Sequence, residues 1–187
     1  MSRNGAIARV REYFDQGKFF EDLSRRVAYP TESQNDARSA DLLAYLTEEM
    51  IPYLKAMNFD SQLLDNQEAE KIPFLVAQRI EDLRLPTLLI YGHGDTVWAM
   101  EDRWRAGLTP WRLIKEGDYW YGRGTADNKG QHTINLAALA AVMEEKGRLG
   151  YNAKVLIEMG EEIGSPGLHA ICEREKEMLK ATVLIAS

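Results

Sequence analysis

The feature that most constrains the fold is an unbroken apolar run that ends abruptly in polar residues set between glycines. Residues 87–96 are Thr-Leu-Leu-Ile-Tyr-Gly-His-Gly-Asp-Thr, without the alternation of a half-exposed strand. Such runs are typical of a strand that helices cover on both faces. Ligands of open α/β sheets bind beyond the carboxyl ends of such strands, which is where His93 falls. The run therefore predicts an α/β fold with a candidate site at His93.

His93 and Asp95 are two residues apart, so in an extended chain their side chains share a face. This spacing suits a metal-binding His93 whose ring is oriented by Asp95, because a ligating imidazole usually donates its other N–H to a carboxylate. The alternative from this segment alone is a histidine that is simply hydrogen-bonded at a strand end.

A second candidate is the carboxylate of Asp127, in the glycine-rich stretch Gly-Arg-Gly-Thr-Ala-Asp-Asn-Lys-Gly at residues 122–130. The glycines allow close backbone approach, and an Ala- and Leu-rich helix is expected at about 131–146. A dinucleotide fingerprint is disfavoured because the third glycine, a preceding buried strand and a later acidic residue are missing. The alternative role for Asp127 is a helix cap.

The third candidate is the acidic pair Glu161 and Glu162, which follows a predicted buried strand at 154–159. Adjacent carboxylates at such a strand end repel each other and lose hydration unless a cation or a hydrogen-bond donor compensates. The alternative is an exposed acidic turn that leads into a helix at about 167–179.

Composition limits the class of protein. A chain of 187 residues is long enough for one α/β domain and too short for two comfortable ones. The formal charge of −6 and scattered basic residues argue against nucleic-acid binding. The sequence has neither an apolar run of membrane-spanning length nor an apolar signal core, so no membrane partner and a cytoplasmic location are expected. Cys172 is the only cysteine and is expected to be structural, at a half-buried helix position.

The remaining elements follow from periodicity and turn residues. A helix is expected at about 6–27, weakened at Gly17, and another from Asp36 whose apolar face Pro52 should kink or end. Strands are expected at 63–64, at 74–80 beside the strand at 87–93, and at 181–186 as a buried strand. A hairpin is expected from 112–115 and 119–121.

Taken together, the three candidate positions lie just past an apolar strand or hairpin, each in a glycine-containing loop. Zinc accepts neutral imidazole and carboxylate ligands, and a carboxylate that is not a ligand can take a proton from water. His93, Asp127 and Glu162 as ligands, with Glu161 as general base, meet this requirement.

These motifs resemble the three successive signatures of the co-catalytic zinc peptidases. They are Gly-His-Gly-Asp-Thr-Val at 92–97, Gly-Arg-Gly-Thr-Ala-Asp-Asn-Lys-Gly at 122–130 and Glu-Glu-Ile-Gly-Ser-Pro at 161–166. That family includes carnosinase-type dipeptidases, glutamate carboxypeptidase, aminoacylase, acetylornithine deacetylase and succinyl-diaminopimelate desuccinylase. The resemblance implies a three-layer fold with a largely parallel central sheet flanked by helices and incomplete at the C-terminus.

The resemblance also implies a role for each residue. His93 binds one of two zinc ions, Asp127 bridges both and Glu162 binds the other. Glu161 is the general base and Asp95 orients His93. The peptide bond between Asp127 and Asn128 is expected to be cis. Cobalt or manganese are possible in place of zinc.

The sequence also departs from the family pattern. Members are longer, take another acidic ligand from just after the position of Ser187 and a histidine from far downstream, and carry a lid domain used for dimerisation. Residues 1–187 are therefore expected to be the N-terminal part of a catalytic domain, with weak zinc binding and negligible hydrolysis of their own. Met159-Gly160 reverses the glycine-first order usual before the paired acids. His132 and His169 match no ligand position and are expected to be structural or solvent-facing.

The function expected of the full-length protein is metal-dependent cleavage of an amide bond in a dipeptide or small peptide. Its partners would be that substrate and a second subunit bound through the lid. One alternative is an N-acyl amino acid deacylase of the acetylornithine deacetylase or desuccinylase type. The other is a non-catalytic α/β module whose acids serve only as caps and solvated turns.

Overall fold

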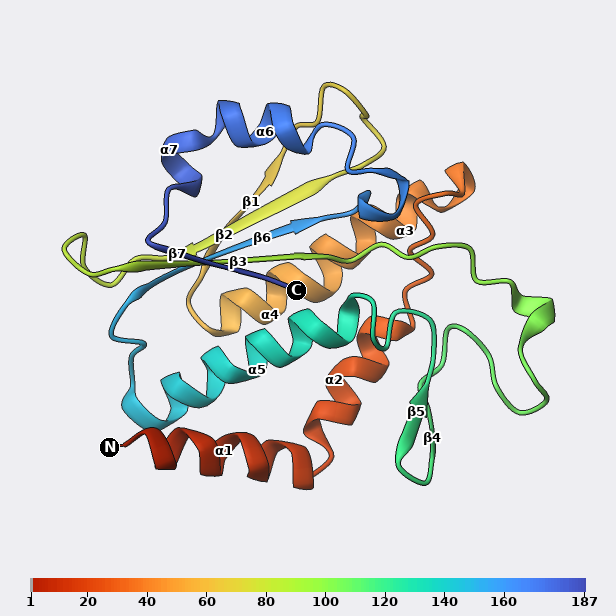
Figure 1. Cartoon of the computed structure of the whole chain (residues 1–187), viewed down its shortest axis with the longest axis horizontal. Coiled ribbons are helices and arrows are strands. Elements are labelled where there is room, and N and C mark those ends of the chain that lie inside the picture. Colours follow the sequence, from red (N-terminus) through yellow and green to blue (C-terminus); the bar gives the residue numbers. More distant parts are fainter. Residues whose placement is uncertain (1) are drawn as a thin grey trace.

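The computed structural model describes residues 2–187 and is built on a five-stranded sheet in the order β1-β2-β6-β3-β7 (Figure 1). Strand β2 runs against the other four, so β6, β3 and β7 form the parallel part. The bounds are β1 (Asp60–Leu64), β2 (Phe74–Arg79), β3 (Thr87–His93), β6 (Asn152–Glu158) and β7 (Val183–Ala186). The mixed, mainly parallel sheet confirms the predicted α/β class.

Strands β3 and β6 end at the same edge of the sheet, and this register places the candidate site. They pair from Thr87 opposite Asn152 to His93 opposite Glu158. Every residue of β6 is buried, as expected for a strand covered on both faces. The prediction that the strand at 74–80 lies beside the strand at 87–93 was wrong, because β6 lies between them.

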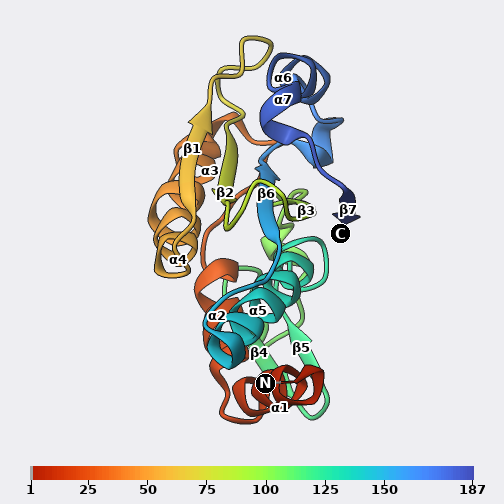
Figure 2. The same cartoon turned by 90° about the vertical axis from the view of Figure 1, so that its left-hand side faces the viewer.

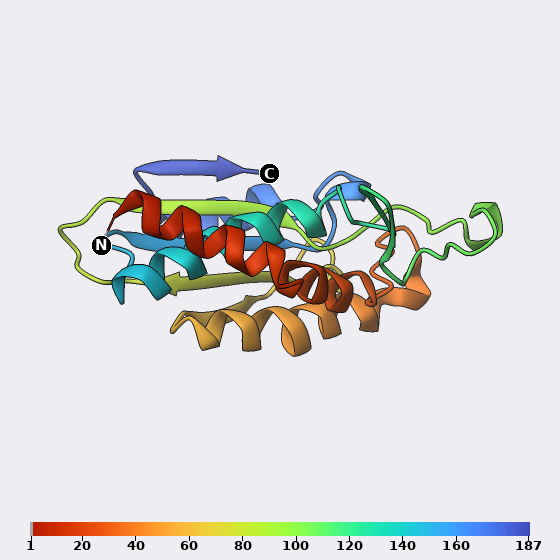
Figure 3. The same cartoon turned by 90° about the horizontal axis from the view of Figure 1, so that it is seen from below.

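Helices cover both faces of the sheet and complete the three predicted layers (Figure 2). One face is covered by α3, η2, α4 and α5, and the other by α6 and α7; α1 and α2 pack outside α5 (Figure 3). None of the helices within residues 2–187 combines the length and apolarity needed to cross a bilayer. The helix bounds are α1 (Arg3–Asp15), α2 (Lys18–Val27), α3 (Ser39–Ala44), α4 (Ile51–Ala56), α5 (Lys129–Lys146), α6 (Leu168–Arg174) and α7 (Lys176–Leu179). Shorter turns are η1 (Asp36–Arg38), η2 (Tyr45–Met50), η3 (Glu101–Arg103) and η4 (Glu161–Ile163).

Three predicted helices differ in detail from the structure. The expected helix at 6–27 is two helices, because Gly17 adopts a left-handed φ of 79° at which the chain changes direction. Pro52 does not end the second helix: it lies in the first turn of α4, after the π-helical turn η2. The helix expected at 167–179 breaks at Glu175 into α6 and α7.

The core lies between the sheet and the helices. The apolar face predicted for the second helix is buried, with Leu46, Met50 and Leu54 fully inaccessible. These side chains belong to one cluster with residues of β2 and β6 and with Leu136 of α5. Burial of this face compensates for the irregular backbone around Pro52.

Two predictions of burial were wrong. The last strand, β7, forms as expected but all its residues are exposed, and Leu184 is 61% exposed. It is the edge strand of the sheet and pairs only with β3 among the described residues. Cys172 is also exposed rather than half-buried, because Ile171, and not its neighbour, faces the core from α6.

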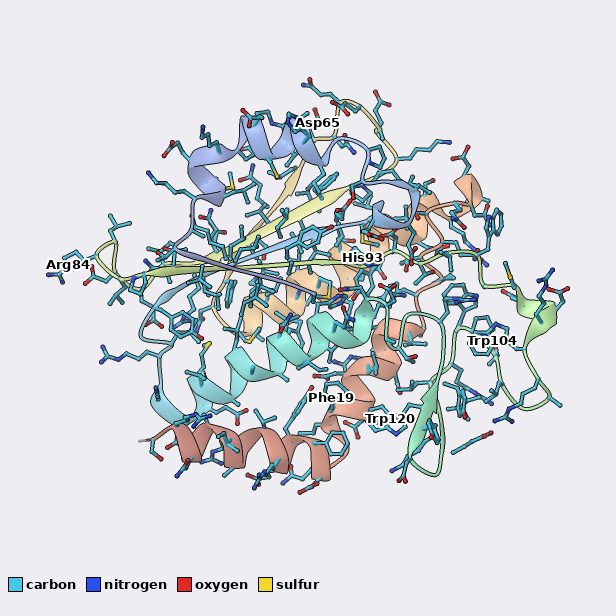
Figure 4. The ribbon with its side chains drawn as sticks, in the orientation of Figure 1. Phe19, Asp65, Arg84, His93, Trp104 and Trp120 are labelled. Atoms are coloured by element: carbon cyan, nitrogen blue, oxygen red, sulfur yellow. The ribbon has the colours of Figure 1, made fainter. Side chains whose placement is uncertain are left out.

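The predicted hairpin consists of β4 (Ile114–Glu116) and β5 (Tyr119–Tyr121) and lies apart from the main sheet. Trp120 attaches it to α2: its ring is 5.8 Å from that of Phe19 and 5.2 Å, edge-on, from that of Phe20 (Figure 4). This aromatic cluster is separate from the main core.

Candidate metal centre

His93 is the last residue of β3 and lies at the sheet edge with its side chain only 4% exposed (Figure 4). Its Nδ1 is 3.1 Å from Oδ1 of Asp95, whose side chain is fully buried. The contact predicted from the i, i+2 spacing is therefore present. It fixes the plane of the imidazole and directs Nε2 away from Asp95.

Asp95 also holds the loop that follows β6. The backbone N–H of Glu161 donates to its Oδ1, and that of Glu162 donates to its Oδ2, each at 3.2 Å. One buried carboxylate thus joins the end of β3 to the start of η4.

Asp127 reaches the other nitrogen of His93, with Oδ1 at 3.0 Å from Nε2. Its side chain is 71% exposed. The capping alternative is not supported, because the N-cap of α5 is Asn128 and no side-chain cap bond forms there. The peptide bond between Asp127 and Asn128 is cis, as predicted.

The acidic pair lies beside the same nitrogen. Oε2 of Glu161 is 3.8 Å from His93 Nε2. One donor atom from each of His93, Glu161 and Glu162 lies within 4.8 Å of the other two. The three loops that the sequence singled out therefore converge on one point at the rim of the sheet.

This arrangement creates a strongly negative potential at His93. Burial by itself lowers the pKa of His93, but the hydrogen bond and charge of Asp95, with the charges of Glu161 and Asp127, outweigh burial and raise the pKa to about 9. Burial, followed by the charge of Asp127, raises the pKa of Glu162. The site favours a cation at Nε2, and in the metal-free chain that cation is a proton.

The donor set fits a divalent metal ion. One imidazole and several carboxylates match the ligands of zinc and of similar borderline ions. Ligand atoms at about 2.0–2.2 Å from one ion lie at most about 4.4 Å apart, and the donor atoms of His93, Glu161 and Glu162 lie within 4.8 Å of one another, close to that spacing. Glu161 is 45% exposed at its side chain.

Sequence reasoning missed the groups beneath His93. Asn128 and His132 are each 1% exposed and are joined by a hydrogen bond of 3.2 Å, and His132 in turn meets Tyr45. The i, i+4 spacing of Asn128 and His132 at the start of α5 is a sequence signal that points to this contact. The expectation that His132 and His169 are structural or solvent-facing agrees with the burial of His132 and the exposure of His169.

Comparison with known proteins identifies the family of the chain. The chain matches the peptidase family M20/M25/M40 over residues 89–186. Beta-Ala-His dipeptidase of Rattus norvegicus is 28% identical over 93% of this chain and 37% of its own length. Cys-Gly metallodipeptidase of Candida albicans is 30% identical over 86% and 35%, respectively.

A solved structure has the same fold. Human carnosine dipeptidase 1 superimposes with a TM-score of 0.86 at 26% identity, covering 96% of this chain and 40% of that one. The chain thus spans well under half the length of the relatives it matches. The family match covers more than half of the chain and includes all three converging loops. The chain belongs to peptidase family M20/M25/M40.

Proposed function

We propose that this chain carries part of the active site of a metal-dependent hydrolase that cleaves dipeptides or other small peptides. One observation carries the proposal: Nε2 of a buried, oriented imidazole faces carboxylates from two other loops, Asp127 at 3.0 Å and Glu161 at 3.8 Å. Acidic turns that served only solubility could lie anywhere on the surface and would not be expected to converge on a buried histidine.

In this proposal His93, Asp127 and Glu162 would hold two zinc ions, and Asp127 would be a ligand shared by both. Asp127 suits the shared position because its exposed carboxylate has two oxygens and already contacts His93. His93 is prepared for binding through Nε2 because Asp95 accepts the Nδ1 hydrogen.

The bound metal supplies Lewis-acid chemistry, polarising the scissile carbonyl and making the attacking water more acidic. Glu161 is the general base. It takes a proton from that water and passes it to the leaving amine. Its backbone N–H is anchored on Asp95 while its carboxylate stays partly exposed, so it can reach both water and substrate.

The substrate class comes from the relatives. Two of them are named for the dipeptides β-alanyl-histidine and cysteinylglycine.

The test is hydrolysis by the complete gene product in the presence of Zn²⁺. We expect cleavage of β-alanyl-histidine or cysteinylglycine, and loss of at least about a hundredfold in kcat for Glu161→Gln with zinc still bound. If the protein cleaved N-acetyl amino acids in preference to dipeptides, it would be a deacylase and the proposed substrate class would be wrong. Ordinary turnover by the Glu161→Gln variant would contradict the assignment of the base.

A further inference from the structure

A buried chain of polar groups runs beneath His93, on the side of β3 that faces α5. The backbone N–H of His93 donates to the side-chain oxygen of Asn128 at 3.3 Å. The same oxygen lies 3.2 Å from Nδ1 of His132, and Nε2 of that imidazole lies 2.5 Å from the hydroxyl of Tyr45. Asn128, His132 and Tyr45 are at most 1% exposed.

The hydrogen bonds fix the direction of each donor in this chain. The amide nitrogen of Asn128 donates to Gln131 at 2.8 Å, which orients its oxygen toward His93 and His132. An amide oxygen only accepts hydrogen bonds, so Nδ1 of His132 carries the hydrogen. Nε2 is then an acceptor, and the hydroxyl of Tyr45 donates to it.

The glycines on either side of His93 make room for these groups. A Cβ on Gly92 would lie 2.9 Å from the side-chain oxygen of Asn128. A Cβ on Gly94 would lie 2.5 Å from the ring of Tyr45. The Gly-His-Gly sequence is therefore shaped to hold the backbone of His93 against Asn128 and Tyr45.

We propose that Tyr45, His132 and Asn128 form a positioning relay that holds the backbone of His93 and the loop of Asp127 in register for metal binding. The relay joins η2, the start of α5 and the end of β3. Asp95 fixes the imidazole of His93 through Nδ1, and the relay fixes the main chain of His93 through its backbone N–H. The link to metal binding rests on the function proposed above.

A purely space-filling role would not call for these residue types. Burying a hydroxyl, an imidazole and an amide costs free energy that apolar side chains of similar size avoid. The cost is offset only because each group is hydrogen-bonded in a defined direction. Directional support for a neighbouring functional residue accounts for their presence.

The first test is the tautomer of His132 in the metal-free protein, measured by long-range ¹H–¹⁵N correlation spectroscopy. The relay requires the form protonated at Nδ1, with Tyr45→Phe losing the donor to Nε2 and shifting that resonance. The form protonated at Nε2 would overturn the relay. The exposed His169 provides an internal reference without such constraint.

The second test compares the affinity for Zn²⁺ of Tyr45→Phe with that of the control Tyr119→Phe, which alters a hydroxyl on a residue 69% exposed. We expect Tyr45→Phe to weaken zinc binding about tenfold, as loss of an outer contact commonly does, and Tyr119→Phe to leave it unchanged. Thermal unfolding and circular dichroism verify that both variants are folded. Equal affinities in two folded variants would overturn the positioning role.

Failure of the proposed function would look different. If the complete gene product bound no zinc, the metal assignment would be wrong, and the tautomer of His132 and hydrogen exchange at the amide of His93 would still test the relay. We then expect faster exchange at that amide in Tyr45→Phe than in Tyr119→Phe. Unchanged exchange would overturn the relay.

Discussion

The two sides of His93 differ in burial and in hydrogen bonding. Asp95, Asn128 and His132 are at most 1% exposed and are tied to backbone or side-chain partners. Asp127 and Glu161 are 71% and 45% exposed at their side chains and make few contacts besides His93. Structural support and metal chemistry therefore lie on different sides of His93. The buried groups should mainly determine the stability of the fold, and the exposed carboxylates should mainly determine metal affinity and turnover.

The largest effect on stability is expected for Asp95→Ala. The change removes the partner of His93 Nδ1 and of the backbone N–H groups of Glu161 and Glu162. We expect a loss of about 3 kcal/mol in the free energy of unfolding, because a buried charged hydrogen-bonding centre is lost. Urea unfolding measures it.

Asp118→Ala is the matched control, since Asp118 lies exposed in the hairpin turn. Its free energy of unfolding should stay within about 0.5 kcal/mol of the unmodified protein. If the two variants were equally stable, the buried groups would not determine stability as proposed.

Glu162→Gln should have the opposite effect: it should weaken zinc binding without lowering stability. The substitution keeps the shape of the side chain but removes a charged ligand, so zinc affinity should fall by at least about a hundredfold. Stability in the metal-free protein should be unchanged or slightly higher, because repulsion from Asp127 and Glu161 is relieved. Competition with a chromophoric chelator and parallel unfolding curves measure both quantities. A large loss of stability with intact zinc binding would contradict the assignment of Glu162 to metal binding.

Gly94→Ala tests the space on the buried side. Its Cβ would lie 2.5 Å from the ring of Tyr45 and 2.7 Å from the sulfur of Met159, both in the core. Overpacking of this kind costs about 1–3 kcal/mol. Gly5→Ala is the control, because its Cβ would meet only the flexible end of Glu145 on the surface. Equal unfolding midpoints would show that the strand end is not tightly packed.

The last prediction concerns the pH dependence of zinc affinity. The pKa of His93 is about 9 in the metal-free chain, so its Nε2 is protonated at neutral pH and must lose a proton to bind zinc. Raising the pH from 7 to 9 removes this competitor, and zinc affinity should rise about tenfold per unit and level off above 9. Asp95→Asn lowers the pKa of His93 and should make the plateau start at lower pH. A flat profile between pH 7 and 9 would contradict the role of His93.

The sequence predicted the parts of the fold that local patterns encode. The apolar run before Glu161 marked a fully buried strand, and the run before His93 marked a strand that is half-buried along its first part and buried at its carboxyl end. Parallel strands bring their carboxyl ends to one edge of the sheet. Convergence of the acids on His93 followed from that geometry. The contact between His93 and Asp95 followed from the period of a strand.

The features that the sequence did not predict depend on tertiary packing. The insertion of β6 between β2 and β3 is a non-local pairing without a local signature. The exposure of β7 follows from its position at the edge, which an apolar run does not reveal. Tyr45 lies 87 residues from His132 along the chain, so only the folded structure shows that they meet.

The most direct test of the account is the position of zinc in crystals of the protein, located by anomalous scattering at the zinc edge. The account predicts zinc at about 2.0–2.1 Å from Nε2 of His93, with carboxylate oxygens of Asp127 and Glu162 completing the ligands that this chain supplies. Zinc bound elsewhere, with Nε2 of His93 still hydrogen-bonded to Asp127, would contradict it.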